Sequence, residues 1–465
     1  MPKPRSIVHP YIPNSTPGSK DEMLRELGIN NIDSLFSAIP PELRLDHPLN
    51  LPEPLFSEYE LRKHITKTLG KNTSTEEHIS FLGSGCYQHY VPAVCDEINS
   101  RNEFLTAYSG KAYEDHGRFQ ALFEYASMMG ELLNMDVVSL PTYDGLQAAA
   151  TAMRMASNIT GRREIILARA IHPDKISKVL EYNGHLLKFQ FIDFEHRSGE
   201  MDFSQIENAI SADTAAVYFD NPNFFGVIES NGQSIADLAH RHGALLIVGA
   251  DPISLGILKP PADYGADITC GDIQSLGMHM QFGGGHAGYI ATRDEEKFIM
   301  EYPNRIVGLV PTRVAGEYGF GEIAMERTSF LARENGNEWL GTMANLWAIT
   351  AGVYLALMGP QGMAEIGDAI ASRVEYTLQS LSQIKGVQIQ FPNAAHFREF
   401  VLDFSQSGRS VNEVHRLLRR RGIFGGYDIS GKFPKLQNHA VYCVTEIHSR
   451  EDIDSLVVNL AEVLS

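Results

Sequence analysis

An acidic residue stands at the end of an apolar run near the middle of the chain. Asp251 directly follows Leu245–Ala250, which has the length and composition of a buried strand. A carboxylate there can keep the ring nitrogen of a pyridine-type cofactor protonated, and the ring then acts as an electron sink. The same residue could instead cap the turn at Pro252, and the local sequence favours neither interpretation.

A glycine-rich loop follows farther along the chain. Gly283, Gly284 and Gly285 could gather backbone N–H groups around a phosphate, although a tight turn before a strand explains the triplet somewhat better by itself. Residues 283–288 also match G-x-G-x-x-G, but a dinucleotide site needs a helix directly after that motif. Residues 289–292 are typical of a strand, so the sequence argues against an NAD site.

An acid at a strand end and a phosphate loop are typical of enzymes that use pyridoxal phosphate (PLP). Such enzymes also need a lysine for the Schiff base, and it is expected between the acid and the glycine loop. Residues 272–282 contain no lysine, Lys259 lies too early, and Lys297 lies beyond the next strand. We therefore expect no complete catalytic set within this chain alone.

Charge and spacing argue against other classes of protein. Acidic residues outnumber basic ones by 57 to 39, so the chain should repel nucleic acid. No spacing suits a metal site: His240 and His242 would point to different sides of a helix, and His279 and His286 flank the glycine loop without an evident carboxylate partner. The four cysteines form no C-x-x-C pair, which favours a reducing compartment and a cytoplasmic protein.

One uncharged stretch resembles a membrane span. Residues 339–363 carry no charged side chain, but polar residues interrupt them, and the apolar part, 346–358, is too short to cross a bilayer. We expect a buried helix that joins two domains, and no membrane contact.

The elements around the candidate residues alternate between strand and helix. Strands are expected at 165–168, 186–192, 215–219, 244–248, 268–270 and 287–291, and helices at 173–182, 203–210 and 233–242. This alternation predicts an α/β fold with a mainly parallel sheet covered on both faces.

Three regions are expected along the chain. Residues 1–70 form a proline-rich arm with short helices, which cannot bury its own surface and is expected to wrap a larger body, often a partner subunit. Residues 71–335 form the large α/β domain. Residues 336–465 form the linking helix and a small α+β domain. Within this last part, strands are expected at 387–390, 400–403 and 440–444, and helices at 411–421 and 453–463.

Several longer motifs resemble one known family. They are residues 81–94 (FLGSGCYQHYVPAV), 104–108 (FLTAY), 143–145 (YDG), 170–173 (AIHP), 250–252 (ADP), 274–277 (QSLG), 422–427 (GIFGGY) and 443–446 (CVTE). In this order they resemble the alpha subunit (subunit 1) of glycine dehydrogenase (decarboxylating), the P-protein of the glycine cleavage system. The similarity runs from His9 to the last helix.

The resemblance implies a fold-type-I PLP-dependent transferase, similar to aspartate aminotransferase. It also implies a homologous, lysine-bearing beta subunit as partner, in a heterodimer or heterotetramer. PLP is expected on that beta subunit, which agrees with the lysine missing here. The assembled enzyme is expected to decarboxylate glycine and to pass the aminomethyl group to the lipoyl arm of the H-protein.

The resemblance further implies residues that help to build the partner's site. In related dimers, a tyrosine-bearing loop and a glycine loop complete the neighbouring site. The candidates acting on the partner are Tyr108, Ser109, Lys111, Tyr113, Glu114, Tyr87 and His89. The candidates on the cofactor side are Gly283, Gly284, Gly285, Tyr143 and, as a vestigial pyridinium partner, Asp251.

Two stretches, residues 108–117 and 333–345, depart from the family pattern. The second lacks several positive charges that could serve anionic groups or the acidic H-protein. Two alternatives therefore stay open: a diverged paralogue that acts with a lysine-bearing partner on another amino acid, and a scaffold without catalysis.

Overall fold

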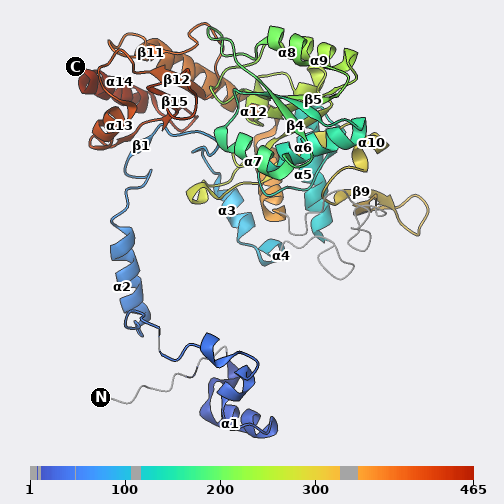
Figure 1. Ribbon diagram of the computed structural model, residues 1–465, viewed down its shortest axis with the longest axis vertical. Helices are drawn as coiled ribbons and strands as arrows, with labels where there is room; N and C mark the ends of the chain where they lie inside the picture. Colours follow the sequence, from blue (N-terminus) through green and yellow to red (C-terminus); the bar gives the residue numbers. More distant parts are fainter. Residues whose placement is uncertain (1–7, 9–11, 48, 106–116, 325–343) are drawn as a thin grey trace. The chain divides into compact units, whose positions relative to one another are not determined.

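The computed structural model describes residues 8, 12–47, 49–105, 117–324 and 344–465 (Figure 1). By its internal contacts the chain forms two compact units, Met1–Thr73 and Ser74–Ser465. Every strand described below lies in the second unit.

The described residues of the first unit include the helices α1 (Pro17–Glu26) and α2 (Glu58–Leu69). Short 3-10 turns lie at Pro13–Ser15, Ile32–Phe36 and Pro41–Leu43. The Ser57 side chain accepts a hydrogen bond from the Glu60 N–H and so caps α2, and Gly70 follows the last residue of the helix. Neither α1 nor α2 buries a side chain, so these helices form no hydrophobic core of their own.

The second unit is built on a sheet that has seven strands within the described residues, in the order β2-β8-β7-β6-β5-β3-β4. Strands β7, β6, β5, β3 and β4 run parallel, whereas β8 pairs antiparallel with both β7 and β2. The strands are β2 (Val137–Val138), β3 (Glu164–Ala168), β4 (Lys188–Ile192), β5 (Thr214–Asn221), β6 (Leu245–Ala250), β7 (Ile268–Asp272) and β8 (Gly288–Thr292). The mainly parallel sheet predicted from the sequence is confirmed.

Helices connect these strands and share a buried core with them. Helix α6 presents a row of alanines to the sheet, which lets the helix lie close to the strands. The helices of this part are α5 (Gly117–Leu133), α6 (Gly145–Thr160), α7 (Pro173–Asn183), α8 (Phe203–Ala209), α9 (Gly232–Arg241) and α10 (Glu296–Ile299). Shorter pieces are α3 (Ala93–Asn99), α4 (Asn102–Leu105) and the 3-10 turns Ser254–Gly256, Pro261–Tyr264 and Gln281–Gly283.

The C-terminal part carries a second, antiparallel sheet in the order β11-β12-β15-β14 (red-brown in Figure 1). Its elements are β11 (Gln388–Ile389), β12 (Glu399–Asp403), α13 (Val411–Arg419), β14 (Tyr427–Asp428), β15 (His439–Cys443) and α14 (Arg450–Leu464). Strand β1 (Ile79–Ser80) pairs in parallel with β13 (Ile423–Phe424), so the segment after β1 starts beside the C-terminal sheet. A hairpin of β9 (Ile306–Pro311) and β10 (Tyr318–Ile323) completes the strands.

Helix α12 (Asn345–Leu381) contains the predicted linking helix and extends well beyond it. It kinks at Gly359, whose φ of 58° leaves the helical region just before Pro360. The side chains of Ala348, Ala351 and Tyr354 are buried, as expected for a helix inside the protein. Among the described residues, no helix is both long and apolar enough to traverse a bilayer.

Candidate functional site

A cavity of about 530 Å³ lies at the carboxyl ends of β5, β6 and β7. The segment Gly83–Tyr87, which follows β1, forms one wall, and residues 397–399 at the start of β12 form another. The first turns of α6 and α7 complete the lining. Carboxyl ends of parallel strands are where open α/β sheets bind ligands, so this cavity is the candidate site.

Asp251 lines this cavity directly after β6, as predicted, but its partner comes from within the chain. Its Oδ1 lies 3.1 Å from Nη2 of Arg398 and accepts a hydrogen bond from the Ile253 N–H at 3.2 Å. Its Oδ2 is buried without a hydrogen-bond partner in the part of the chain that the structure describes. The acid expected to face a pyridinium ring is therefore paired with an arginine.

Arg398 is held in place from several sides, and its side chain is only 8 % exposed. Its guanidinium lies 3.4 Å from the centre of the Tyr87 ring, a cation–π contact. Its backbone φ of 48° lies in the left-handed region, which is costly for a residue with a side chain. Burial by itself would lower the pKa of Arg398, but the carboxylate of Asp251 raises it, so the side chain stays a cation.

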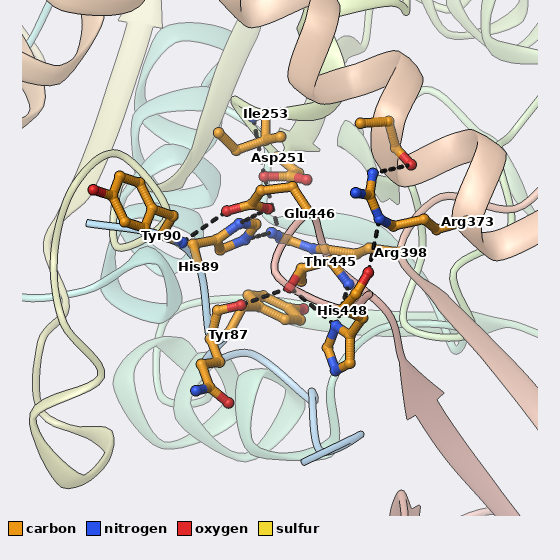
Figure 2. Close-up of polar contacts among 12 residues, drawn as sticks. Tyr87, His89, Tyr90, Asp251, Ile253, Arg373, Arg398, Thr445, Glu446 and His448 are labelled. Atoms are coloured by element: carbon orange, nitrogen blue, oxygen red, sulfur yellow. Dashed lines mark hydrogen bonds and ion pairs between the residues drawn. The ribbon is translucent and has the colours of Figure 1, made fainter. Parts of the chain in front are cut away.

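The network continues through His89 to Glu446, as Figure 2 shows. A guanidinium can only donate, so Nε2 of His89, 3.0 Å from Nη1 of Arg398, is the accepting nitrogen. Nδ1 then donates to Glu446 at 2.7 Å. Burial would raise the pKa of Glu446, but the contacts with His89 and with the Tyr90 N–H lower it. Two residues predicted to act on a partner, Tyr87 and His89, thus both contact the internal Arg398.

Tyr87 is also fixed through its backbone. Its N–H donates to Oε1 of Gln274 and its carbonyl accepts from Nε2, each at 3.0 Å. Its hydroxyl donates to Glu399 at 2.9 Å, and Glu399 accepts a further hydrogen bond from the Ser84 N–H. Burial raises the pKa of Glu399 and that of Tyr87. Gln274 lies in the stretch where the Schiff-base lysine was expected, and it holds a segment of this chain instead.

The N-terminus of α6 reaches the cavity beside β7. The Gly145 N–H donates to Oδ2 of Asp272 at 2.8 Å, and Asp144 caps the helix by accepting from the Gln147 N–H. A Cβ at position 145 would lie 2.9 Å from Cβ of Asp272, so only glycine allows this approach. His286 adds its Nδ1 at 3.2 Å from the same carboxylate oxygen.

The expectation that His279 and His286 lack carboxylate partners is wrong. His286 pairs with Asp272, and His279 lies 3.1 Å from Asp96 in α3. Neither pair is apparent from the sequence, because each joins residues from separate elements. Hydrogen bonding to Asp272, and then to Cys86, raises the pKa of His286 to about 10, so the imidazole is protonated at neutral pH.

Lys175 is a cavity residue that the sequence did not point to. Among the lining residues described, it is the only lysine, and its Nζ lies 2.7 and 2.8 Å from the two oxygens of Asp220. It also donates to the Tyr218 hydroxyl at 3.2 Å. A signal existed: Lys175 lies in the first turn of a predicted helix, and that turn begins at the carboxyl edge of the sheet.

The remaining candidates differ in where they lie. Gly283 lines the cavity, but the N–H groups of Gly283, Gly284 and Gly285 donate to carbonyls of their own loop, at Met280 and Gln281. Tyr143 is half exposed and does not line the cavity. Roles for these residues in a partner's site stay predictions. The other in-trans candidates lie outside the described residues: Tyr108, Ser109, Lys111, Tyr113 and Glu114.

Sequence comparison connects this arrangement to one family. The profile of the glycine cleavage system P-protein matches residues 9–460. The chain belongs to this family. Relatives described as "probable glycine dehydrogenase (decarboxylating) subunit 1" share 38 % identity in Staphylothermus marinus and 36 % in Saccharolobus islandicus, with 98 % of both chains covered in each case. The relative of that name in Desulforamulus reducens shares 37 % identity over 97 % of this chain and 99 % of its own.

Solved structures agree with this membership. The inhibitor-bound crystal structure of glycine decarboxylase (P-protein) of the glycine cleavage system superposes with a TM-score of 0.85 at 32 % identity, covering 98 % of this chain and 100 % of that one. Two more distant structures share the fold. Sphingosine-1-phosphate lyase of Burkholderia pseudomallei has a TM-score of 0.64 at 15 % identity, with 91 % of this chain and 93 % of that one covered. Cysteine desulfurase of Thermococcus onnurineus has a TM-score of 0.63 at 17 % identity, with 84 % of this chain and 95 % of that one covered. The predicted family and fold-type-I PLP fold are confirmed.

Proposed function

We propose that this chain is the alpha subunit of a heteromeric glycine dehydrogenase (decarboxylating) and that it does not itself carry PLP. Its relatives with the name subunit 1 match it almost from end to end, which supports both the reaction and the existence of a second subunit. The same relatives disfavour a diverged paralogue and a scaffold without catalysis.

The observation that carries the assignment of PLP to the partner is the set of groups around β7. PLP supplies an electron sink once a lysine amine tethers it. The stretch between Asp251 and the glycine loop offers Gln274, whose amide is used up on the Tyr87 backbone. The cavity's lysine, Lys175, is engaged by both oxygens of Asp220. These residues do not fit a tethered PLP.

The partner is therefore a homologous subunit that bears the lysine. In the assembled enzyme, glycine would lose its carboxylate as CO₂ and the aminomethyl group would pass to the lipoyl arm of the H-protein. This chain would supply the loop at Tyr108 and the glycine loop at 283–285 to the partner's site. The segment 84–90 is fixed within this chain by Gln274, Glu399 and Glu446.

The test is reconstitution with the lysine-bearing subunit. Each subunit alone should lack glycine–bicarbonate exchange, and mixing should restore it. Borohydride reduction in the presence of PLP should mark a lysine of the partner and none in this chain. Lys175→Arg, which keeps the charge but removes the amine, checks the cavity's lysine. A stable pyridoxyl adduct on this chain, with turnover in the absence of any partner, would refute the proposal.

A further inference from the structure

The N-terminus of α6 is the natural anion site of the cavity. The first backbone N–H groups of a helix have no partner within it, and its dipole favours negative charge there. The α6 helix spans residues 145–160, and its first turn lines the cavity through Asp144, Gly145 and Leu146. A phosphate entering this cavity would find its best electrostatic position at this turn.

That position is already occupied by a carboxylate of the chain. Asp272, the last residue of β7, accepts the Gly145 N–H at 2.8 Å and the Gln274 N–H at 2.9 Å. The protonated His286 lies 3.2 Å from the same side chain and holds its negative charge in place. The N-terminus of α6, two backbone N–H groups and the imidazolium of His286 thus all stabilise the carboxylate of Asp272.

The opposite wall shows the complementary arrangement. The cation that faces Asp251 is the guanidinium of Arg398, anchored on Tyr87 and on His89. A ring nitrogen that needed this carboxylate would have to compete with a buried ion pair, and breaking such a pair is costly.

The charge of the whole cavity points the same way. Its carboxylates are Asp144, Asp174, Asp220, Asp251, Asp272 and Glu399. Its cations are Lys175, Arg398 and the protonated His286. Leaving aside Glu399, whose pKa burial raises, five carboxylates face three cations among the lining residues that the structure describes. A phosphate dianion would add like charge to an acidic cavity.

We infer that Asp272 acts as a built-in substitute for a phosphate and, with Arg398 on Asp251, excludes the phosphorylated cofactor from this subunit's cavity. Asp272 is then a specificity-determining residue, which keeps PLP for the partner subunit. The inference rests on the proposed function in that PLP belongs to the partner. It adds that this chain rejects the cofactor even without a covalent bond.

The test measures non-covalent binding to the full-length chain by isothermal titration calorimetry. The probe is pyridoxamine 5′-phosphate, which has the ring and phosphate of PLP but no aldehyde to react with surface lysines. Pyridoxamine, without the phosphate, is the matched ligand. Wild-type chain should not bind the phosphate form measurably. Asp272→Ser should raise the affinity for it by about tenfold or more, because one like charge is gone and the Gly145 N–H is free. Pyridoxamine should gain far less.

Asp267, directly before the same strand, supplies a matched control. It lies 2.8 Å from Nε2 of His240 and accepts the Leu246 N–H at 2.8 Å, so like Asp272 it contacts a histidine and accepts a backbone N–H. It does not line the cavity. Asp267→Ser should therefore leave binding at the wild-type level. Thermal unfolding verifies that each variant is folded. If Asp272→Ser does not fold, Asp272→Asn, which keeps the shape of the side chain, is used in its place.

Three outcomes overturn the inference: tight binding of pyridoxamine 5′-phosphate by wild-type chain, no gain in either Asp272 variant, or an equal gain in Asp267→Ser. None of them would decide whether the mixed subunits act on glycine, which is measured by exchange activity. Tight binding by the wild-type chain would, in addition, count against the proposal that this chain carries no PLP. Conversely, the binding pattern can hold even if the mixed subunits fail to act on glycine.

Discussion

Two ion pairs lie at the carboxyl edge of the same sheet and differ in what they connect. Asp220 near the end of β5 holds Lys175 of α7, and Asp251 after β6 holds Arg398 at the start of β12. The first pair joins neighbouring elements of the α/β part. The second joins the sheet to the C-terminal part and, through Tyr87 and His89, to the segment after β1.

Their supports differ accordingly. Lys175 binds Asp220 and Tyr218, with about 13–14 % of each ion-pair side chain exposed. Arg398 contacts the ring of Tyr87, His89 and the carboxylate of Asp251. Its own backbone is in the left-handed region. A residue held in an unfavourable backbone conformation must be stabilised by its surroundings. The arginine pair is therefore a tertiary junction, whereas the lysine pair is a local contact.

The largest effect is expected from Arg398→Leu. Removing one member of a buried pair leaves the Asp251 carboxylate uncompensated and should lower the free energy of unfolding by about 4 kcal/mol. Chemical denaturation of the purified chain measures it. Replacing Asp251 by leucine as well should recover a good part of the loss, because no charge is then left alone. If the double variant is no more stable than Arg398→Leu, the pair is not the source of the loss.

A smaller effect is expected from Lys175→Met. The pair is slightly more exposed and the loss stays within the α/β part, so we expect about 2 kcal/mol, measured in the same way. Lys175→Arg keeps the charge and serves as its control. A loss equal to that of Arg398→Leu would erase the distinction between junction and local contact.

The smallest effect is expected from Tyr87→Phe. The phenyl ring still supports the guanidinium, and only the hydroxyl hydrogen bond to Glu399 is lost, at about 1 kcal/mol. Tyr87→Leu also removes the ring and should cost more, since the cation–π contact disappears. Equal losses in the two variants would show that the stack on Arg398 contributes nothing to stability.

Local patterns were sufficient for most of the α/β part. The strands around residues 164–292 were predicted to within a few residues because parallel strands are continuous apolar runs between helices. Asp251 was found because it ends such a run. The two-residue strands β1 and β13 were not predicted, since so few residues carry no periodicity. The hairpin of β9 and β10 was not predicted either, although each of its strands has six residues.

The partners of the candidate residues could not be predicted in this way. Arg398 precedes a predicted strand, but its contact with Asp251 is set by how the C-terminal sheet packs on the cavity. Glu446 was noticed only as part of a family motif, and Asp272 only as the start of a stretch without lysine. A contact between distant segments cannot be read from the residue spacing within either segment. The sequence therefore showed that the lysine is missing, but it did not show the ion pairs of Asp251 and Asp272 around that position.

Besides Gln274, the segment 84–90 has its partners at Arg398, Glu399, Thr445 and Glu446. During synthesis, this early segment leaves the ribosome long before those residues exist. The nascent α/β part can form its parallel strands, and Gln274 can bind the Tyr87 backbone, while the segment still lacks its C-terminal partners; its full set of hydrogen bonds forms only when nearly the whole polypeptide has been made. A chain truncated before residue 446 would therefore expose this segment to chaperones and proteases for its entire lifetime.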